Sequence, residues 1–121
     1  MNILYILKHN PWGIGGGCYA CRNYLELFSE IFKDMHIDVL ICSEYLKNAK
    51  LTDFTNCRFI HVAPRTRFEK YMSPLTGVLH RHNGVAKRMI AENDYDYCIF
   101  DHNSIAGSLV DDCRKAGIKT I

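Results

Sequence analysis

The amino-acid sequence predicts an α/β fold in which a doubly wound parallel sheet of about five strands carries helices on both faces. Short apolar runs alternate with longer segments whose apolar residues recur at helical spacing, and this alternation implies right-handed crossovers between parallel strands. The chain has 121 residues, of which 48% are apolar and 23% charged. These values fit a single domain over residues 1–121 that buries its own core.

The first half of the chain contains three strand-like runs and one long helical segment. Each apolar run is short enough for a buried parallel strand, and the three runs cover residues 2–7, 37–42 and 57–62. A breaker segment rich in glycine fills residues 8–17, and helical spacing then extends from Cys18 to about Met35. Residues 43–56 are polar and irregular, with space for one helical turn.

The second half repeats this alternation after a basic loop. Ser73 and Pro74 predict a helix start, because a capping hydroxyl precedes a proline at the first helical position. Gly117 is expected to end the last helix in the position that favours glycine. The expected elements are a helix from Ser73 to Ile90, a strand over 97–100, a helix from Ser104 to Ala116 and a strand over 118–121.

No segment predicts export or a membrane span. The N-terminus has neither a basic leader nor a small-residue cleavage site, and no apolar run approaches the roughly 20 residues of a membrane helix. The six cysteines, at positions 18, 21, 42, 57, 98 and 113, mostly fall in apolar runs. We therefore expect a cytoplasmic protein with buried, reduced thiols.

The net charge of +2 hides a basic segment. Residues 64–90 hold six basic side chains and one acid, and Arg65, Arg67 and Lys70 lie within six residues of one another. One interpretation is a solvated helix face with its loop. The other is a site for an anionic partner, such as a phosphate or a membrane headgroup.

Gly13, Gly15, Gly16 and Gly17 lead directly into the first predicted helix. Glycines allow close backbone approach, and the helix N-terminus behind them offers free N–H groups, so phosphate is the expected ligand. The alternative is a flexible turn. The spacing matches neither a dinucleotide fingerprint, since Cys18 occupies the third glycine position, nor a P-loop.

Two further motifs lie near the same edge of the predicted sheet. Cys18 and Cys21 form a CxxC at a helix start, which is where thiol redox proteins place their reactive pair, although burial of Cys21 on the apolar face would raise its pKa. The polar segment Asp101-His102-Asn103-Ser104 follows the fourth strand, where His102 and Asn103 are candidates for substrate contact. The alternative is helix capping by Asn103 or Ser104, with His102 solvated. The remaining thiols fall in core positions, so we expect no metal site.

Several of these segments resemble a known enzyme family. Asn10-Pro11-Trp12-Gly13-Ile14-Gly15-Gly16-Gly17, the long helix after it and the run Met35-His36-Ile37-Asp38-Val39-Leu40-Ile41 resemble the opening of GT-B glycosyltransferases of the retaining, GT4-like type. Asp96-Tyr97-Cys98-Ile99-Phe100, His102 and Ala116-Gly117-Ile118 are similar to later parts of the same domain. The resemblance covers nearly the whole chain but only the N-terminal, Rossmann-like half of such an enzyme.

The resemblance implies sugar transfer from a nucleotide-sugar donor to a sugar or lipid-linked acceptor, in cell-surface polysaccharide or glycolipid synthesis. Gly15, Gly16 and Gly17 would face the donor diphosphate. The acceptor, with possible peripheral membrane contact, would meet the side chains of Arg65, Arg67, Lys70, His102 and Asn103.

The resemblance also implies that the C-terminal donor domain is absent and that the catalytic group is expected just beyond Ile121. This chain alone is then expected to be inactive. The nucleotide sugar would enter as substrate, with no tightly bound cofactor, no metal ion and no nucleic-acid partner. The alternatives are a stand-alone module that binds a phosphorylated ligand and a thiol redox module using Cys18 and Cys21.

Overall fold

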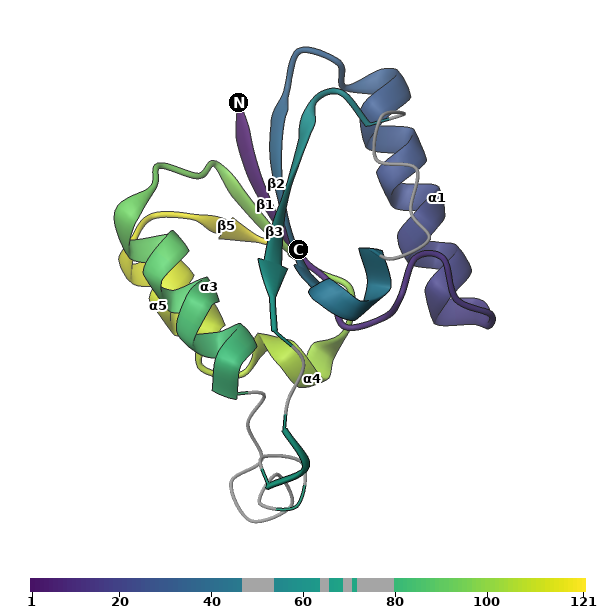
Figure 1. Ribbon diagram of the computed structural model, residues 1–121. Coiled ribbons are helices and arrows are strands. Elements are labelled where there is room, and N and C mark those ends of the chain that lie inside the picture. Colours follow the sequence, from purple (N-terminus) through teal and green to yellow (C-terminus); the bar gives the residue numbers. More distant parts are fainter. Residues whose placement is uncertain (47–53, 64–65, 69–70, 72–79) are drawn as a thin grey trace.

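The computed structural model describes residues 1–46, 54–63, 66–68, 71 and 80–121. Its elements are β1 (Asn2–Ile6), α1 (Gly16–Ile31), β2 (His36–Cys42), the 3₁₀ helix η1 (Ser43–Leu46), β3 (Cys57–Val62), α3 (His80–Glu92), β4 (Tyr97–Phe100), α4 (Asn103–Ala106), α5 (Leu109–Lys115) and β5 (Lys119–Thr120). The strands form one parallel sheet in the order β3-β2-β1-β4-β5 (Figure 1). The predicted five-stranded parallel sheet is therefore confirmed.

Strand β1 occupies the middle of the sheet and contributes to two separate cores. Side chains alternate between the faces of a strand, so Leu4 and Ile6 join a core with α3 and α5, whereas Ile3 and Tyr5 join a core with α1. Figure 1 shows α1 on one side of the sheet and α3 and α5 on the other. Burial on both faces explains why the β1 sequence is an uninterrupted apolar run.

Helix α1 begins earlier and ends earlier than the sequence predicts. Gly15 has φ 131°, which favours glycine and places it as the residue before the helix, so Gly16 and Gly17 belong to the first turn. At the other end, Asn56 Nδ2 donates to the carbonyls of Phe28, Phe32 and Met35. These bonds tie the segment before β3 to the end of α1, where the carbonyls of Phe28 and Phe32 also accept backbone N–H groups.

The single helix predicted over 104–116 is wrong, because the structure divides it into α4 and α5. Gly107 has φ +36° and interrupts the helix between them. Gly117, with φ +74°, follows α5 as expected. The predicted helix start at Ser73 and Pro74 lies outside the described residues, and the described part of that helix runs from His80 to Glu92.

A buried aspartate joins the strands at the sheet edge where the strands begin. Asp38 of β2 accepts two hydrogen bonds from Arg58 of β3, both at 2.8 Å, and one from the Tyr95 hydroxyl. His36 Nε2 lies 3.0 Å from the same carboxylate. Burial alone raises the pKa of Asp38, but the hydrogen bonds from Arg58 and Tyr95 and the Arg58 charge outweigh it and hold the pKa below its usual value.

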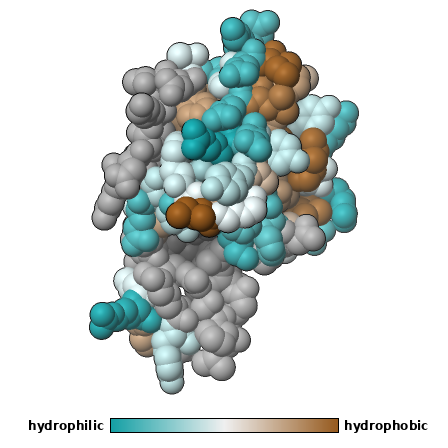
Figure 2. Space-filling view, turned by 90° about the vertical axis from the view of Figure 1, so that its right-hand side faces the viewer, coloured by the Kyte–Doolittle hydropathy of each residue, from teal (hydrophilic) through white to brown (hydrophobic). Residues whose placement is uncertain are grey.

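The described part of the chain contains no helix with the length and apolar character needed to cross a bilayer. Helix α1 does carry exposed apolar side chains on its outer surface, and they include Tyr24, Leu27 and Ile31. The side of the molecule that faces the viewer in Figure 2 accordingly mixes apolar and hydrophilic residues.

Candidate functional site

The strand order places a crevice between the ends of β1 and β4. The chain passes from β1 to β2 on one side, while β4 pairs with β1 on the other, so the strand order reverses between β1 and β4. In open parallel sheets, ligands bind at this point, beyond the carboxyl ends of the strands. His9 follows β1 and Asp101 follows β4, and a hydrogen bond joins the two residues at this point.

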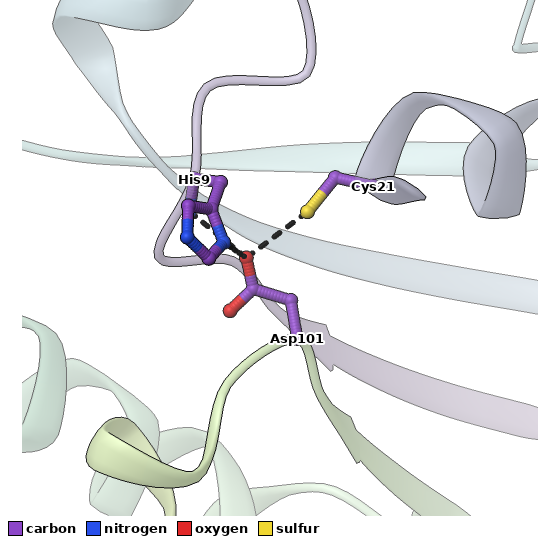
Figure 3. A group of neighbouring side chains, drawn as sticks. All are labelled: His9, Cys21 and Asp101. Carbon is purple, nitrogen blue, oxygen red and sulfur yellow. Dashed lines mark hydrogen bonds and ion pairs between the residues drawn. The ribbon is translucent and has the colours of Figure 1, made fainter. Parts of the chain in front are cut away.

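Asp101 connects three elements through one carboxylate oxygen. Its Oδ2 accepts the backbone N–H of His9 at 2.8 Å, lies 3.0 Å from His9 Nδ1, and accepts the Cys21 thiol of α1 at 3.0 Å (Figure 3). The Asp101 side chain is 2% exposed and the His9 side chain 32% exposed. A buried carboxylate therefore fixes a histidine ring that stays partly exposed to solvent.

The hydrogen bonds decide which nitrogen of His9 is available for chemistry. Because Asp101 Oδ2 acts as the acceptor for the His9 N–H and the Cys21 thiol, the His9 Nδ1 beside it carries a proton. Nε2 is then the nitrogen that can take up or deliver a proton. The His102 ring lies edge-on to the His9 ring, with 5.6 Å between the ring centroids.

Gly17 makes space for the His9 ring against the first turn of α1. A Cβ atom at position 17 would lie 2.8 Å from His9 Nε2 and 2.9 Å from two ring carbons, closer than side chains pack. Only glycine therefore lets the imidazole rest on the helix at this place. Gly17 therefore has a steric role that the sequence alone did not show.

The start of α1 is open at the same edge. The first helical hydrogen bond runs from the Tyr19 N–H to the Gly15 carbonyl, so the N–H groups of Gly16, Gly17 and Cys18 precede the helical bonding pattern. No side-chain bond caps the helix, and a Cβ at Gly15 or Gly16 would meet nothing within 4 Å. These groups and the helix dipole offer a place for an anion beside His9.

The structure places the CxxC cysteines in different environments. Cys21 is buried, and burial followed by the hydrogen bond to the Asp101 carboxylate raises the pKa of its thiol to about 12. This agrees with the expected direction. A thiol that stays protonated is a poor nucleophile, so the environment of Cys21 disfavours the redox alternative. All six cysteines are free thiols.

His9 Nδ1, Cys21 Sγ and Asp101 Oδ2 lie within 4.8 Å of one another, near enough to share a metal ion. The sequence interpretation expected no metal site, since the thiols other than Cys18 and Cys21 fall in core positions. The hydrogen bonds among the three groups account for their positions without an ion. We therefore interpret the cluster as a proton-bearing network.

The residues predicted to bind the acceptor are only partly brought together. His102 is exposed beside His9, and Asn103 begins α4 at the same edge. Arg67 is exposed, whereas Arg65 and Lys70 lie outside the described residues. The predicted donor residues Gly15, Gly16 and Gly17 do lie at this edge.

Sequence reasoning missed His9, and it placed Asp101 in the candidate segment 101–104 without giving it a role of its own. Each is a polar residue that comes shortly after a buried strand, and Asp101 directly follows Phe100. That position was the available signal, but it could not show that the two loops meet. Comparison with protein-family models finds no match for this chain, and comparison with curated proteins finds none either.

Proposed function

We propose that this chain is the acceptor-side domain of a glycosyltransferase that moves a sugar from a nucleotide-sugar donor to an acceptor hydroxyl. One observation carries the proposal. A histidine held by a buried carboxylate rests on the open N-terminus of α1 at the crevice between β1 and β4. Transfer to a hydroxyl needs an anion site for the leaving diphosphate and a base for the hydroxyl proton, and the two lie side by side.

The donor part of the site is the first turn of α1. The N–H groups of Gly16, Gly17 and Cys18 offer hydrogen bonds to phosphate oxygens, and the helix dipole adds a partial positive charge. No side chain projects from Gly15 or Gly16, so a diphosphate can approach the backbone directly. The remaining nucleotide contacts belong to a second domain, as the resemblance to GT-B enzymes implies.

The acceptor part of the site is the His9–Asp101 pair. Nε2 of His9 takes the proton from the acceptor hydroxyl, while the Asp101 carboxylate keeps Nδ1 protonated and stabilises the imidazolium that forms. The Cys21 thiol, as a further donor to Oδ2, keeps the carboxylate in its orientation.

A base of this kind implies a particular stereochemical result. A base acts on a hydroxyl that attacks from the face opposite the leaving group, which inverts the anomeric centre. The resemblance to GT4-like enzymes instead implies retention. The anomeric configuration of the product is therefore informative, and we expect inversion. Retention would leave His9 without this role.

The test is donor-dependent product formation by the longest natural protein that contains this sequence, with a panel of nucleotide sugars and hydroxyl acceptors. We expect turnover by the wild type and a loss of about 10²–10⁴-fold in kcat for His9→Ala. His36→Ala is the matched control, because His36 also lies beside a buried aspartate but at the opposite sheet edge. Equal losses in both variants, or hydrolysis of the donor without transfer, would contradict the proposal.

A further inference from the structure

Three side chains that commonly bind metal ions meet where β1 and β4 end. His9 comes from the loop after β1, Cys21 from α1 and Asp101 from the end of β4 (Figure 3). Asp101 Oδ2 lies 3.0 Å from His9 Nδ1 and 3.0 Å from Cys21 Sγ, and all three atoms lie within 4.8 Å of one another. The fold therefore gathers one nitrogen, one sulfur and one oxygen ligand from three separate elements.

These separations suit one ion placed between the three atoms. In a tetrahedral site with metal–ligand bonds of about 2.0–2.3 Å, neighbouring ligand atoms lie about 3.3–3.6 Å apart. The two separations from Asp101 Oδ2 are slightly shorter, because hydrogen bonds now join these atoms. Small outward shifts of the side chains would give an ion the room it needs.

The charge of the cluster favours a divalent cation. The Asp101 side chain is 2% exposed, and its Oδ1 has no hydrogen-bond partner among the described residues. Buried charges in proteins are paired or bind metal ions. The Asp101 carboxylate and a Cys21 thiolate together would neutralise a divalent ion, and the uncharged His9 imidazole would complete the set of protein ligands.

The ligand atoms also select the kind of metal. Sulfur and imidazole nitrogen suit Zn²⁺ and its spectroscopic substitute Co²⁺, whereas Mg²⁺ and Ca²⁺ prefer oxygen atoms alone. Three protein ligands leave the fourth tetrahedral position to water. The His9 side chain is 32% exposed and borders solvent, so the ion would enter on its side of the cluster.

We propose that His9 Nδ1, Cys21 Sγ and Asp101 Oδ2 form a binding site for Zn²⁺, in which the ion replaces the protons of the hydrogen-bonded network. On binding, the Cys21 thiol releases its proton to solvent. The imidazole proton moves from Nδ1 to Nε2, so that the Nδ1 electron pair can bind the metal. Without an ion, the hydrogen bonds hold the same three side chains in place.

The metal-bound form of His9 cannot act as a base. With Nδ1 on the ion, Nε2 carries the proton and cannot accept another from a hydroxyl group. This consequence rests on the proposed function. Zn²⁺ should therefore inhibit sugar transfer, and a chelator should restore it.

The first test adds Co²⁺ to the metal-free protein and follows the absorption spectrum. We expect intense visible bands from tetrahedral cobalt and a near-ultraviolet band from a cobalt–thiolate bond, both saturating at one ion per chain. Zn²⁺ should remove these bands by displacing Co²⁺, whereas Mg²⁺ should leave them unchanged. A spectrum without the cobalt–thiolate band would overturn the proposal.

Two cysteine variants assign this band to one thiol. Cys21→Ser should abolish it, whereas Cys18→Ser should keep it, because Cys18 lies one turn earlier on α1 and outside the cluster. Circular dichroism checks that both variants fold. The proposal is wrong if the band persists in Cys21→Ser. Its loss in Cys18→Ser would also contradict the proposal, because the two thiols would then bind the ion together.

A second measurement needs no variant and holds even if Cys21→Ser fails to fold. X-ray absorption of the Zn²⁺-loaded wild type should show one Zn–S bond of about 2.3 Å and other bonds of about 2.0–2.2 Å to nitrogen or oxygen. Two sulfur ligands, or none, would refute the assignment.

The inference and the proposed function fail separately. Metal binding needs neither a donor nor turnover, so a bound ion in a protein without transfer activity contradicts only the glycosyltransferase proposal. Transfer activity in a protein that shows no cobalt–thiolate band contradicts only the inference. Full transfer activity with the ion bound would contradict the base role of His9 and leave the metal site intact.

Discussion

Two buried aspartates lie at opposite edges of the same sheet, and their partners differ. Asp38 is bonded through both oxygens, by Arg58, Tyr95 and the nearby His36. Asp101 is bonded through Oδ2 alone, and Oδ1 has no partner among the described residues. A fully bonded carboxylate stabilises the fold, whereas a partly bonded one retains capacity for a ligand. We propose that this difference separates a structural edge of the sheet from a functional edge.

The largest expected effect comes from replacing each aspartate by asparagine. Asp101→Asn should lower kcat about 10³–10⁴-fold. In this variant a neutral amide replaces the charged carboxylate that accepts the hydrogen bond from His9 Nδ1–H. Its free energy of unfolding should change by less than about 1 kcal/mol. Asp38→Asn should show the reverse pattern, with activity kept and stability lost. Steady-state kinetics and urea denaturation of both variants measure this, and similar profiles for the two would erase the distinction between the edges.

Removing the positively charged side chain of Arg58 tests the same contrast between the two sheet edges, through stability alone. Arg58→Ala leaves the buried Asp38 carboxylate without its bidentate partner, so the free energy of unfolding should fall by about 2 kcal/mol. This expected loss of stability is smaller than for a fully buried pair, because the Arg58 side chain is 59% exposed. Arg22→Ala breaks only an exposed i,i+4 pair with Glu26 and should cost less than about 0.5 kcal/mol. Equal losses would show that the Asp38 cluster is not specially stabilising.

The loss of folding stability in acid should also originate at Asp38. Its pKa in the folded protein lies below the value of about 3.9 expected when unfolded. The ionised carboxylate therefore contributes stability above about pH 4, and this contribution is lost as the pH falls through the folded pKa. Between about pH 5 and pH 3, the wild type should lose more stability than Asp38→Asn. Parallel stability curves for the two proteins would rule out this role.

The smallest effect distinguishes two adjacent glycines at the functional edge. Gly16→Ala has open space and a helical position, so it should raise the free energy of unfolding by about 0.5–1 kcal/mol. Gly17→Ala should lower it by about 1 kcal/mol, because the new Cβ displaces His9 from Asp101. Gly84→Ala on α3 also has open space and serves as the control for helix propensity. A gain at both positions would show that His9 does not need the space at Gly17.

The sheet could be predicted from sequence because each strand is a local apolar run, and no distant residue changes that pattern. Helix ends were harder to predict. The end of α1 depends on Asn56, which reaches back to three carbonyls from the segment before β3. The break between α4 and α5 depends on the conformation of Gly107, while the apolar spacing continues across it.

The candidate site was predictable only in part, for a similar reason. The glycines before α1 are a local motif, and their position at the ligand edge follows from the alternation of strands and helices. The His9–Asp101 pair has no local motif, because its members lie 92 positions apart. The fit of the His9 ring against Gly17 follows from their positions in space, which no sequence spacing encodes.

The pairing of β1 with both β2 and β4 has a consequence for the order of folding. The β1–β2 contact between Asn2 and His36 spans 34 positions, whereas the β1–β4 contact between Ile3 and Tyr97 spans 94. Closing the longer loop costs about 0.9 kcal/mol more chain entropy. We therefore expect β1, α1 and β2 to associate first and β4 to dock later, with amides of β4 protected last in pulsed hydrogen exchange. A newly made chain thus possesses its histidine long before the aspartate reaches it, so that the His9–Asp101 pair forms only once β4 has docked on β1.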